Sequence, residues 1–372
     1  MKILQVCSAS EMGGGEVHVA DLVRGLTERG HAVSLAVRPA SPLRSALAGV
    51  IASWHEMPLQ NSLDLISARA IAQIVEANKI DIIHAHVGRD YLVAALAERH
   101  GNAARLILTR HHYLPMKRSA LYRWMLRDVA RVIAVSESVR QSVIERLRLP
   151  AERVRTIPNW INPERFKPVE RDAARAMFRL RANIVVACIG QLTPAKGQEE
   201  FVRAAANIGR MRADVEFLIV GAEREEGQPF TEHLRKLAVS LGIRERVTFT
   251  GHVSHLPQLL AAVDVVVVPS WDEGFSLVTL EALAARRAVL ASNIGGIKGI
   301  IYDNTTGLLF PPRDVEALTE KLLWLVADAP LRDRLSAQGQ RDVYNRFSRD
   351  QIIGQIESLY EEVVGEEKKS ET

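Results

Sequence analysis

The most constraining stretch of this sequence is a run of β-branched residues that leads into a helix pattern. Residues Val263 to Val268 read VDVVVV, and the run ends at Pro269. A continuous β-branched run is typical of a parallel strand that is covered on both faces. Ser276 follows at a position typical of an N-cap, with Leu277 beginning an apolar helical spacing. The stretch therefore predicts a strand, a loop and a helix start of the kind found in α/β proteins.

This strand-to-helix loop is where we expect binding chemistry. Ligands of open α/β sheets bind beyond the carboxyl ends of the strands, and N–H groups at a helix start favour a phosphate. Residues 274–277 would supply those groups, and Glu273 and Glu281 stand on either side of them. Glu281 could accept hydrogen bonds from a sugar diol, and Glu273 could reach further out. Both glutamates also fit the simpler interpretation of surface residues.

Strand and helix patterns alternate along the rest of the chain. Lys2–Cys7 and Ala32–Val37 are apolar runs that flank the amphipathic segment Glu16–Arg29, and such a βαβ unit favours a parallel sheet. The pattern starts again at Ile184–Ile189, and 372 residues exceed the usual size of one core. We therefore predict two α/β domains, 1–165 and 170–345. Further strands are predicted at 80–85, 106–109, 131–135, 154–157, 215–220, 247–250 and 288–291.

Glycines and histidines stand near strand ends in the first half. Gly14, Gly15 and Glu16 follow the first strand, and glycines there allow close backbone approach, although a flexible loop has the same composition. Pairs of histidines, 84 with 86 and 111 with 112, stand at the ends of two later strands. A metal site is one interpretation. We predict none, because no carboxylate or cysteine stands at ligand spacing nearby and the chain has no DxD.

Composition and the lengths of the apolar stretches argue against a secreted or membrane-spanning protein. Hydrophobic residues make up 47% and charged residues 25%, with a formal net charge of +4, which is ordinary for a globular protein. The N-terminus begins directly as a strand pattern, without the features of a signal peptide, and no stretch reaches the roughly 18 apolar residues of a spanning helix. We therefore expect a cytoplasmic protein that is not inserted in a membrane.

Several stretches resemble one family. PSWDEGFSLVTLEALAA at 269–285 closely resembles the E-x7-E motif of the family-four retaining glycosyltransferases. AKG at 195–197 resembles the lysine and glycine of that family's phosphate-binding turn. IPNWIN at 157–162 and TGLLFPP at 306–312 resemble its signatures IPNGVD and TGLLVPP. The resemblance covers nearly the whole chain and extends to lipopolysaccharide-type glycosyltransferases.

The resemblance implies the GT-B fold: two Rossmann-like domains with parallel sheets facing a central cleft, and a C-terminal helix, 348–364, that crosses back to the first domain. The first domain would bind the acceptor and the second a nucleotide sugar of UDP or GDP type, with no metal or other cofactor. The implied catalytic residues are Glu273, Lys196 and His111. The implied donor-binding residues are Gly14, Gly15, Gln191, Lys196, Gly274, Phe275, Ser276, Leu277, Glu281 and Val253. Glu16 and His112 would face the acceptor.

The sequence departs from the family pattern at several positions, among them Asn162, which replaces an aspartate. Gln191 replaces an arginine that holds donor phosphates, so one cationic contact is lost. Trp160 replaces a glycine and Gly299 a glutamate.

The expected reaction is glycosyl transfer with retention from a nucleotide sugar to a glycan or glycolipid. Lys196 and the N–H groups at 274–277 would stabilise the departing diphosphate. Transfer to a small soluble acceptor, a sugar-nucleotide epimerase of the same fold and a non-catalytic nucleotide-binding module are the alternatives. A Rossmann dehydrogenase lacks support, because GxGxxG follows neither first strand. No nucleic-acid partner is expected.

Basic residues gather at 105–131, which holds seven Lys or Arg residues against one acid. Within this segment, 119–130 predicts a helix with Arg123, Arg127 and Arg131 in one stripe and an apolar, aromatic face beside it. Such a helix suits an anionic membrane surface, and a solvated helix of an ordinary domain is the alternative. Because many relatives glycosylate lipopolysaccharide, we expect a peripheral enzyme at the inner membrane face that extends a lipopolysaccharide core or a similar glycolipid.

Overall fold

The structure is a computed structural model that describes all residues except 12, 52, 101–103, 113–118, 168 and 371–372. The chain divides into two compact units: the first unit is Met1–Asn159 with Arg349–Thr372, and the second unit is Trp160–Ser348. We predicted a first domain ending at residue 165, and the division falls earlier. The N–H of Ile161 donates to the carbonyl of Phe347 at 2.8 Å, which ties the residues after Asn159 to the second unit.

The first unit is built on a parallel sheet. Its strands are β1 Lys2–Cys7, β2 Ala32–Val37, β3 Ser53–Glu56, β4 Ile82–Ala85, β5 Arg105–Arg110, β6 Arg131–Ala134 and β7 Val154–Thr156. In the described residues these seven strands are ordered β3-β2-β1-β4-β5-β6-β7. The chain therefore leaves β1 in one direction and returns to β4 on its other side, and such a switch point is where ligands of open α/β sheets bind.

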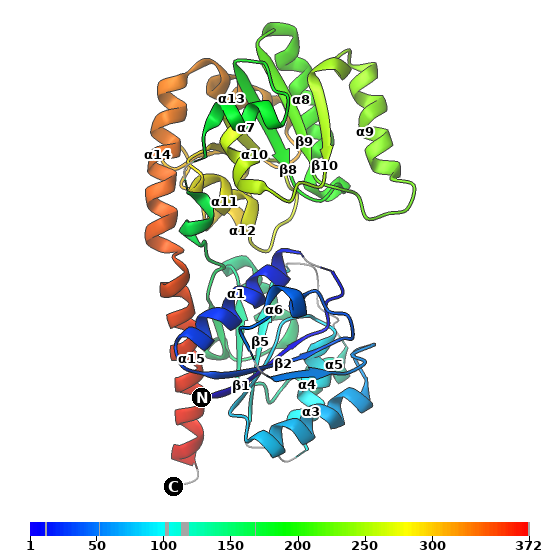
Figure 1. The fold of residues 1–372 in the computed structure, drawn as a ribbon, viewed down its shortest axis with the longest axis vertical. Helices are drawn as coiled ribbons and strands as arrows, with labels where there is room; N and C mark the ends of the chain where they lie inside the picture. Colours follow the sequence, from blue (N-terminus) through cyan, green and yellow to red (C-terminus); the bar gives the residue numbers. More distant parts are fainter. Residues whose placement is uncertain (12, 52, 101–103, 113–118, 168, 371–372) are drawn as a thin grey trace. The chain divides into compact units, whose positions relative to one another are not determined.

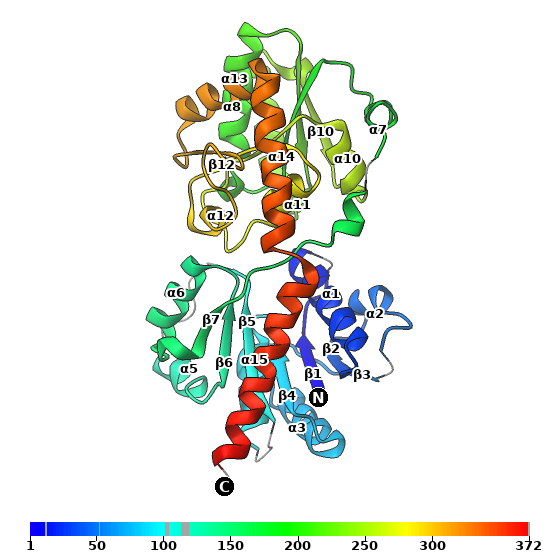
Figure 2. The same ribbon diagram turned by 90° about the vertical axis from the view of Figure 1, so that its left-hand side faces the viewer.

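Helices cover both faces of this sheet. They are α1 Gly14–Glu28, α2 Leu43–Ala46, α3 Leu65–Asn78, α4 Asp90–Glu98, α5 Ala120–Met125, α6 Glu137–Leu147 and α15 Arg349–Ser370. Figures 1 and 2 show α1 and α15 together on one face, and α3, α4 and α5 pack side by side on the other. The apolar face of α15 is buried: Ile352, Ile353, Ile356, Leu359, Tyr360 and Val363.

The second unit contains another parallel sheet. Its strands are β8 Ile184–Ile189, β9 Val215–Val220, β10 Val247–Gly251, β11 Val265–Val268, β12 Ala288–Ser292 and β13 Leu308–Phe310. Their order is β10-β9-β8-β11-β12-β13. The helices are α7 Arg171–Met177, α8 Gln198–Met211, α9 Pro229–Ser240, α10 Leu256–Ala262, α11 Leu277–Ala284, α12 Gly295–Lys298, α13 Val315–Ala327 and α14 Ala329–Arg346. Short 3-10 helices are η1 Ala151–Arg153 in the first unit, and η2 Pro163–Phe166, η3 Pro194–Lys196 and η4 Arg244–Arg246 in the second.

One predicted element is wrong. We expected a helix over 119–130, and α5 ends at Met125. Beyond it the backbone turns to join the sheet, where the N–H of Ala130 donates to the carbonyl of Leu106 at 2.9 Å and Arg131 begins β6. The predicted basic stripe is therefore divided between a short helix, a turn and a strand.

Candidate active site

Three loops of the second unit meet because their strands are neighbours. β11 pairs with β8 on one side and with β12 on the other, all in parallel. The loops that follow these strands therefore leave the sheet at one edge, which is the edge where α/β proteins bind ligands. We call residues 190–197, 269–276 and 293–296 the loop junction.

Glycines hold the loop junction together. Gly197 has a φ of +71°, and a Cβ on it would lie 2.1 Å from the carbonyl oxygen of Pro269. A Cβ on Gly296 would lie 2.1 Å from the carbonyl oxygen of Glu273. Both distances are far below any real contact, so the backbones touch directly and only glycine fits.

Trp271 anchors the middle loop. Its backbone N–H donates to the carbonyl of Ala195 at 2.8 Å, and its ring Nε1 donates to Glu200 Oε1 at 2.8 Å. The guanidinium of Arg313 lies over the ring, 3.9 Å from its centroid. These contacts fix the base of the loop, and no local pattern predicts them because the partners are far apart along the chain.

Lys196 and Glu273, both predicted to be catalytic, form an ion pair. Lys196 Nζ donates to Glu273 Oε1 at 2.5 Å, and Ser270 Oγ donates to the same oxygen at 2.9 Å. The side chains are 32% and 14% exposed, respectively. The cation is therefore neutralised by a carboxylate, and an anion that binds Lys196 must take over part of this interaction.

The helix start beside the pair has the predicted cap. Ser276 Oγ accepts from the N–H of Thr279 at 3.3 Å, and Ser276 is the N-cap of α11. The N–H of Ser276 itself donates to the carbonyl of Gly296 at 3.4 Å, so this N–H is occupied. Phe275 is buried against Phe347, with ring centroids 5.8 Å apart. Its side chain therefore packs into the unit, and only its backbone can face a ligand. Gly274 is buried and Leu277 half-buried in the same turn.

Glu281 lies about one turn into α11, with its side chain 15% exposed. Burial raises the pKa of this carboxyl to about 7, against the opposing charge of Arg165. Arg165 Nη1 lies 3.7 Å from Glu281 Oε1. Arg165, which lies on η2, was not predicted from the sequence, because no local spacing connects it to Glu281.

Gln191, Val253 and Trp160 lie outside these contacts. Gln191 has an exposed side chain directly after β8, and its carbonyl accepts from Gln198 Nε2 at 2.9 Å. Val253 is half-buried after β10, two strands beyond β8 along the same edge. Trp160 is buried in the second unit. Another departure from the family pattern, Gly299, ends α12 with open space where a side chain would be.

In the first unit, the predicted glycine loop forms the start of α1. The N–H of Gly13 donates to Glu16 Oε2 at 2.9 Å, so the Glu16 carboxylate caps the start of α1 instead of standing free for a ligand. Gly14 is the first residue of the helix, and Gly15 has no atom within 4 Å of where a Cβ would stand. Packing does not require glycine at position 15.

Four histidines form a cluster near the carboxyl ends of β4 and β5: His18, His84, His86 and His111. His84 Nδ1 lies 2.6 Å from Tyr360 OH on α15. Ring centroids are 4.1 Å apart for His84 and His86 and 4.8 Å apart for His18 and His111. His84 and His86 are both buried.

Burial keeps this histidine cluster neutral. It lowers the pKa of His84 and of His111 to about 3, and it holds the pKa values of His18 and His86 well below 6.5. Among the described residues, His111 Nε2 is a buried atom with no hydrogen-bond partner. His112, the alternative for the predicted position, is exposed.

The prediction that Arg123, Arg127 and Arg131 form one basic stripe on a helix is wrong. Arg131 Nη2 lies 2.8 Å from Glu362 Oε1 and 2.5 Å from Glu366 Oε1, which are on α15. Arg127 Nε lies 3.2 Å from Asp128 Oδ2, and Arg123 is on α5. Lys117 and Arg118, also counted in the basic segment, lie outside the described residues.

The described part of the chain lacks two features. It contains no group of three or more His, Cys, Asp or Glu residues arranged to hold a metal ion. None of its helices is both long enough and apolar enough to cross a membrane.

Comparison with known proteins gives the family context. Residues 172–342 match the family described as "Glycosyl transferases group 1", and residues 12–165 match "Glycosyltransferase Family 4". A D-inositol 3-phosphate glycosyltransferase of Salinispora tropica is 28% identical over 96% of this chain and 83% of its own. An alpha-D-kanosaminyltransferase of Streptomyces kanamyceticus is 30% identical over 65% of this chain, which spans 62% of that protein.

Solved structures share the fold along the whole chain. Anabaena Alr3699/HepE, solved in complex with UDP, superposes with a TM-score of 0.86 at 23% identity, covering 97% of this chain and 100% of its own. At that identity the likeness concerns the fold alone. The chain therefore has the GT-B fold, and its two units are similar to two glycosyltransferase families, family 4 over residues 12–165 and group 1 over residues 172–342.

Proposed function

We propose that this chain transfers a glycosyl group from a nucleoside diphosphate sugar of UDP or GDP type to a hydroxyl of a glycan or glycolipid. The observation that carries the proposal is the ion pair of Lys196 and Glu273 at 2.5 Å, beside the capped start of α11. A cation and backbone N–H groups at one edge of a parallel sheet suit a diphosphate.

The loop junction has the groups that the departing diphosphate needs. As the bond from sugar to phosphate breaks, negative charge grows on the diphosphate, and preorganised donors stabilise that charge. Lys196 would exchange its bond to Glu273 for one to a phosphate oxygen. The released Glu273 carboxylate, held by Ser270, would then accept from donor sugar hydroxyls. Glu281 would accept hydrogen bonds from the ribose hydroxyls, and Val253 would lie beside the nucleotide base.

The first unit would hold the acceptor. A neutral His111 offers a hydrogen bond to an acceptor or donor sugar hydroxyl without adding positive charge beside the reacting centre. In this proposal transfer proceeds with retention, and no protein side chain is assigned as a covalent nucleophile.

A thermal-shift screen of nucleotide sugars tests the donor site. The matching nucleotide should raise the melting temperature, because a ligand of the folded state stabilises it in proportion to affinity. Lys196→Ala should lose the shift. If no UDP or GDP sugar shifts the wild type, or if Lys196→Ala keeps the shift unchanged, the proposal fails.

Product analysis separates transferase from epimerase. With a nucleotide sugar alone, an epimerase of the same fold would release nucleotide and a free rearranged sugar, whereas a transferase requires an acceptor for efficient turnover. We also propose that no metal takes part. Activity should survive EDTA, and a loss that Mg²⁺ or Mn²⁺ restores would overturn this part of the proposal.

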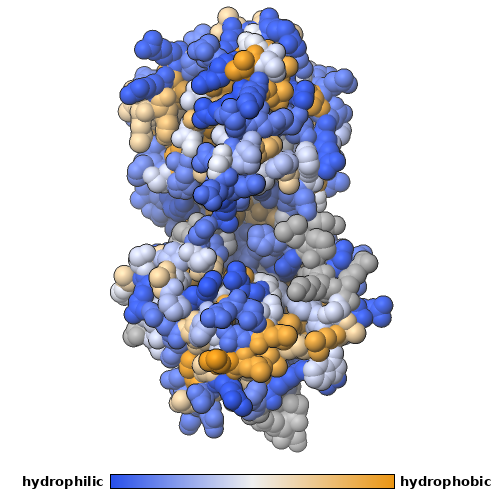
Figure 3. Space-filling model, turned by 90° about the vertical axis from the view of Figure 1, so that its right-hand side faces the viewer, coloured by the Kyte–Doolittle hydropathy of each residue, from blue (hydrophilic) through white to orange (hydrophobic). Residues whose placement is uncertain are grey.

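We further propose that the first unit contacts an anionic membrane that carries the acceptor. Large apolar side chains are exposed on this unit, and Figure 3 shows apolar residues gathered on the side of α3, α4 and α5. Ile66 on α3 is 73% exposed and Trp124 on α5 is 51% exposed. The guanidinium of Arg99 lies 4.3 Å from the centroid of the Trp124 ring, which places a cation beside an aromatic anchor. The membrane would be the inner face, with a lipopolysaccharide core or a similar anionic glycolipid as acceptor.

Vesicle co-sedimentation tests this contact. Ile66→Ser combined with Trp124→Ser should weaken binding to anionic vesicles, and salt should weaken wild-type binding by screening. Met211→Ser is the matched control, since Met211 is 55% exposed on the second unit. Equal binding of both variants, or no binding by the wild type, would favour a small soluble acceptor.

A further inference from the structure

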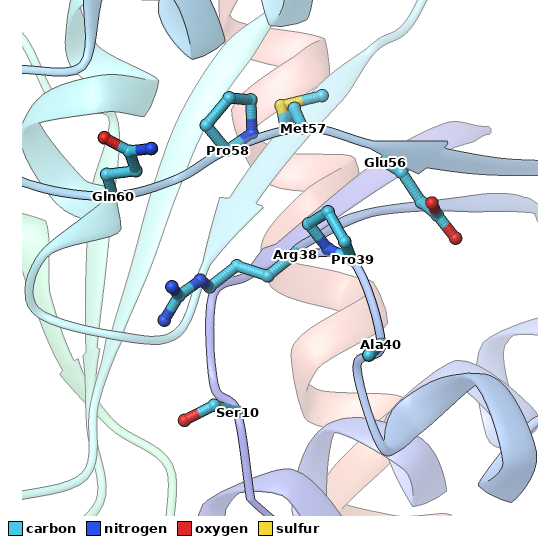
Figure 4. A pocket seen from close by; sticks show the side chains of 8 residues that line it. All are labelled: Ser10, Arg38, Pro39, Ala40, Glu56, Met57, Pro58 and Gln60. Atoms are coloured by element: carbon cyan, nitrogen blue, oxygen red, sulfur yellow. The ribbon is translucent and has the colours of Figure 1, made fainter.

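The first unit contains a cavity that the proposed reaction does not use. It has a volume of about 690 Å³, which is in the range of small-molecule sites. The loops that follow β1, β2 and β3 form its walls, as Figure 4 shows. Its lining residues are Ser10, Arg38, Pro39, Ala40, Glu56, Met57, Pro58 and Gln60.

The charge of this cavity is set by Arg38. The side chain extends from the end of β2 into the space between Ser10 and Gln60 (Figure 4). It is half-buried, and within the described residues its guanidinium has no ion pair or hydrogen bond, although its charge opposes the rise that burial causes in the pKa of Asp90. Glu56, the carboxylate of the lining, is ion-paired with Arg44 on α2 and lies at the other end of the cavity (Figure 4). The cavity therefore presents a cation that no described carboxylate pairs with directly.

The backbone around Arg38 is held in an uncommon conformation. Ala40 has a φ of +58° and Leu59 a φ of +43°, a region that residues with a side chain rarely adopt. The N–H of Ser41 donates to the carbonyl of Arg38 at 3.2 Å, and the N–H of Leu59 donates to Ser67 Oγ at 3.0 Å. Such strain persists only where surrounding contacts enforce it, and it gathers at ligand sites.

We propose that this cavity is an oxyanion subsite in which Arg38 holds a phosphate or carboxylate group of the acceptor. A guanidinium presents two parallel N–H donors that match such a group. The hydroxyl of Ser10 and the amide of Gln60 add neutral donors beside it. Naming the ligand as the acceptor rests on the proposed function, and the acceptor class is then a phosphorylated or acidic sugar, polyol or glycolipid headgroup. Binding of an oxyanion at Arg38 does not depend on that function.

Line broadening of the ³¹P signal of inorganic phosphate tests the subsite on the full chain. Arg38→Gln should weaken phosphate binding about tenfold or more, the usual loss for a charge-assisted hydrogen bond. Arg69→Gln removes one exposed arginine of the same unit outside the cavity and should change nothing. Lys196→Gln separates the second unit's contribution, because it removes the cation of the loop junction. Acetate, added as a competitor, tests whether a carboxylate can occupy the same place.

The outcomes are distinct. Loss of phosphate binding in Arg38→Gln, with UDP or GDP binding unchanged, supports the subsite. No binding by the wild type, equal loss in Arg69→Gln, or loss in Lys196→Gln alone overturns it. Failure of UDP and GDP to bind the wild type would count against the proposed function and would leave the phosphate result to decide the subsite independently.

Discussion

Gly296→Ala should damage the loop junction from the side opposite Lys196. The new Cβ would lie 2.1 Å from the carbonyl oxygen of Glu273 and 2.9 Å from the carbonyl carbon of Gly274. Real contacts begin near 3 Å, so the two loops must separate by roughly 1 Å. Overpacking of this kind costs about 1–3 kcal/mol, and displacing a reacting group by 1 Å costs about a hundredfold in rate. We expect a folded protein with impaired transfer.

Gly299→Ala is the matched control, because Gly299 ends the same short helix and has no atom within 4 Å of a built Cβ. Calorimetric melting should show a decrease of about 2–12 °C for Gly296→Ala, from a few degrees per kcal/mol in a unit of this size. Initial rates with the donor found by screening should fall about a hundredfold in that variant alone. An unchanged rate in Gly296→Ala, or an equal fall in Gly299→Ala, would refute the role assigned to this contact.

Three further predictions concern charged and titrating groups. Lys196→Ala should weaken nucleotide-sugar binding about 10- to 100-fold by calorimetry, whereas the exposed Lys298→Ala should not. Since the pKa of Glu281 is raised to about 7 and its ionised form is the better acceptor, nucleotide-sugar affinity should fall about tenfold per pH unit below 7, and Glu281→Gln should remove this dependence. His86 is buried and neutral, because burial lowers its pKa well below 6.5. As the pH is lowered below 6.5, only the unfolded chain takes up a proton at this residue, so the free energy of unfolding decreases. Between pH 7.5 and 5.5 urea unfolding should show that His86→Gln loses about 1.4 kcal/mol less than the wild type.

The regular strands were predictable because continuous apolar runs define them. β1, β2, β8 and β9 have the predicted bounds, and each is almost entirely buried. β3 was not predicted, because its sequence, SWHE, has no apolar run. It lies at the sheet edge, where its residues are half-buried or exposed. Burial therefore decides which strands a sequence reveals.

The basic segment shows where helical periodicity misleads. The spacing of the arginines at 123, 127 and 131 would place them on one side of a helix. This holds only if the helix continues through all three positions, and α5 ends at Met125. The pairing of Ala130 with Leu106 offers the backbone a sheet hydrogen bond, and Arg131 finds carboxylates on α15. Both partners are distant in sequence, so a local pattern contained no information about them.

Several residues of the candidate site were predictable from the sequence, but the contacts between them were not. Glu273 was predicted from its loop after a buried strand and Lys196 from the family resemblance of its turn, but their contact follows from the strand order β8-β11-β12, which no local pattern specifies. The same order places Gly296 against Glu273, and the return of the chain through η2 brings Arg165 toward Glu281. Each predicted carboxylate therefore already has a cationic neighbour. Binding of an anionic diphosphate is then an exchange of partners at Lys196, and its affinity depends on how well Ser270 and the sugar hydroxyls satisfy the Glu273 carboxylate that the exchange releases.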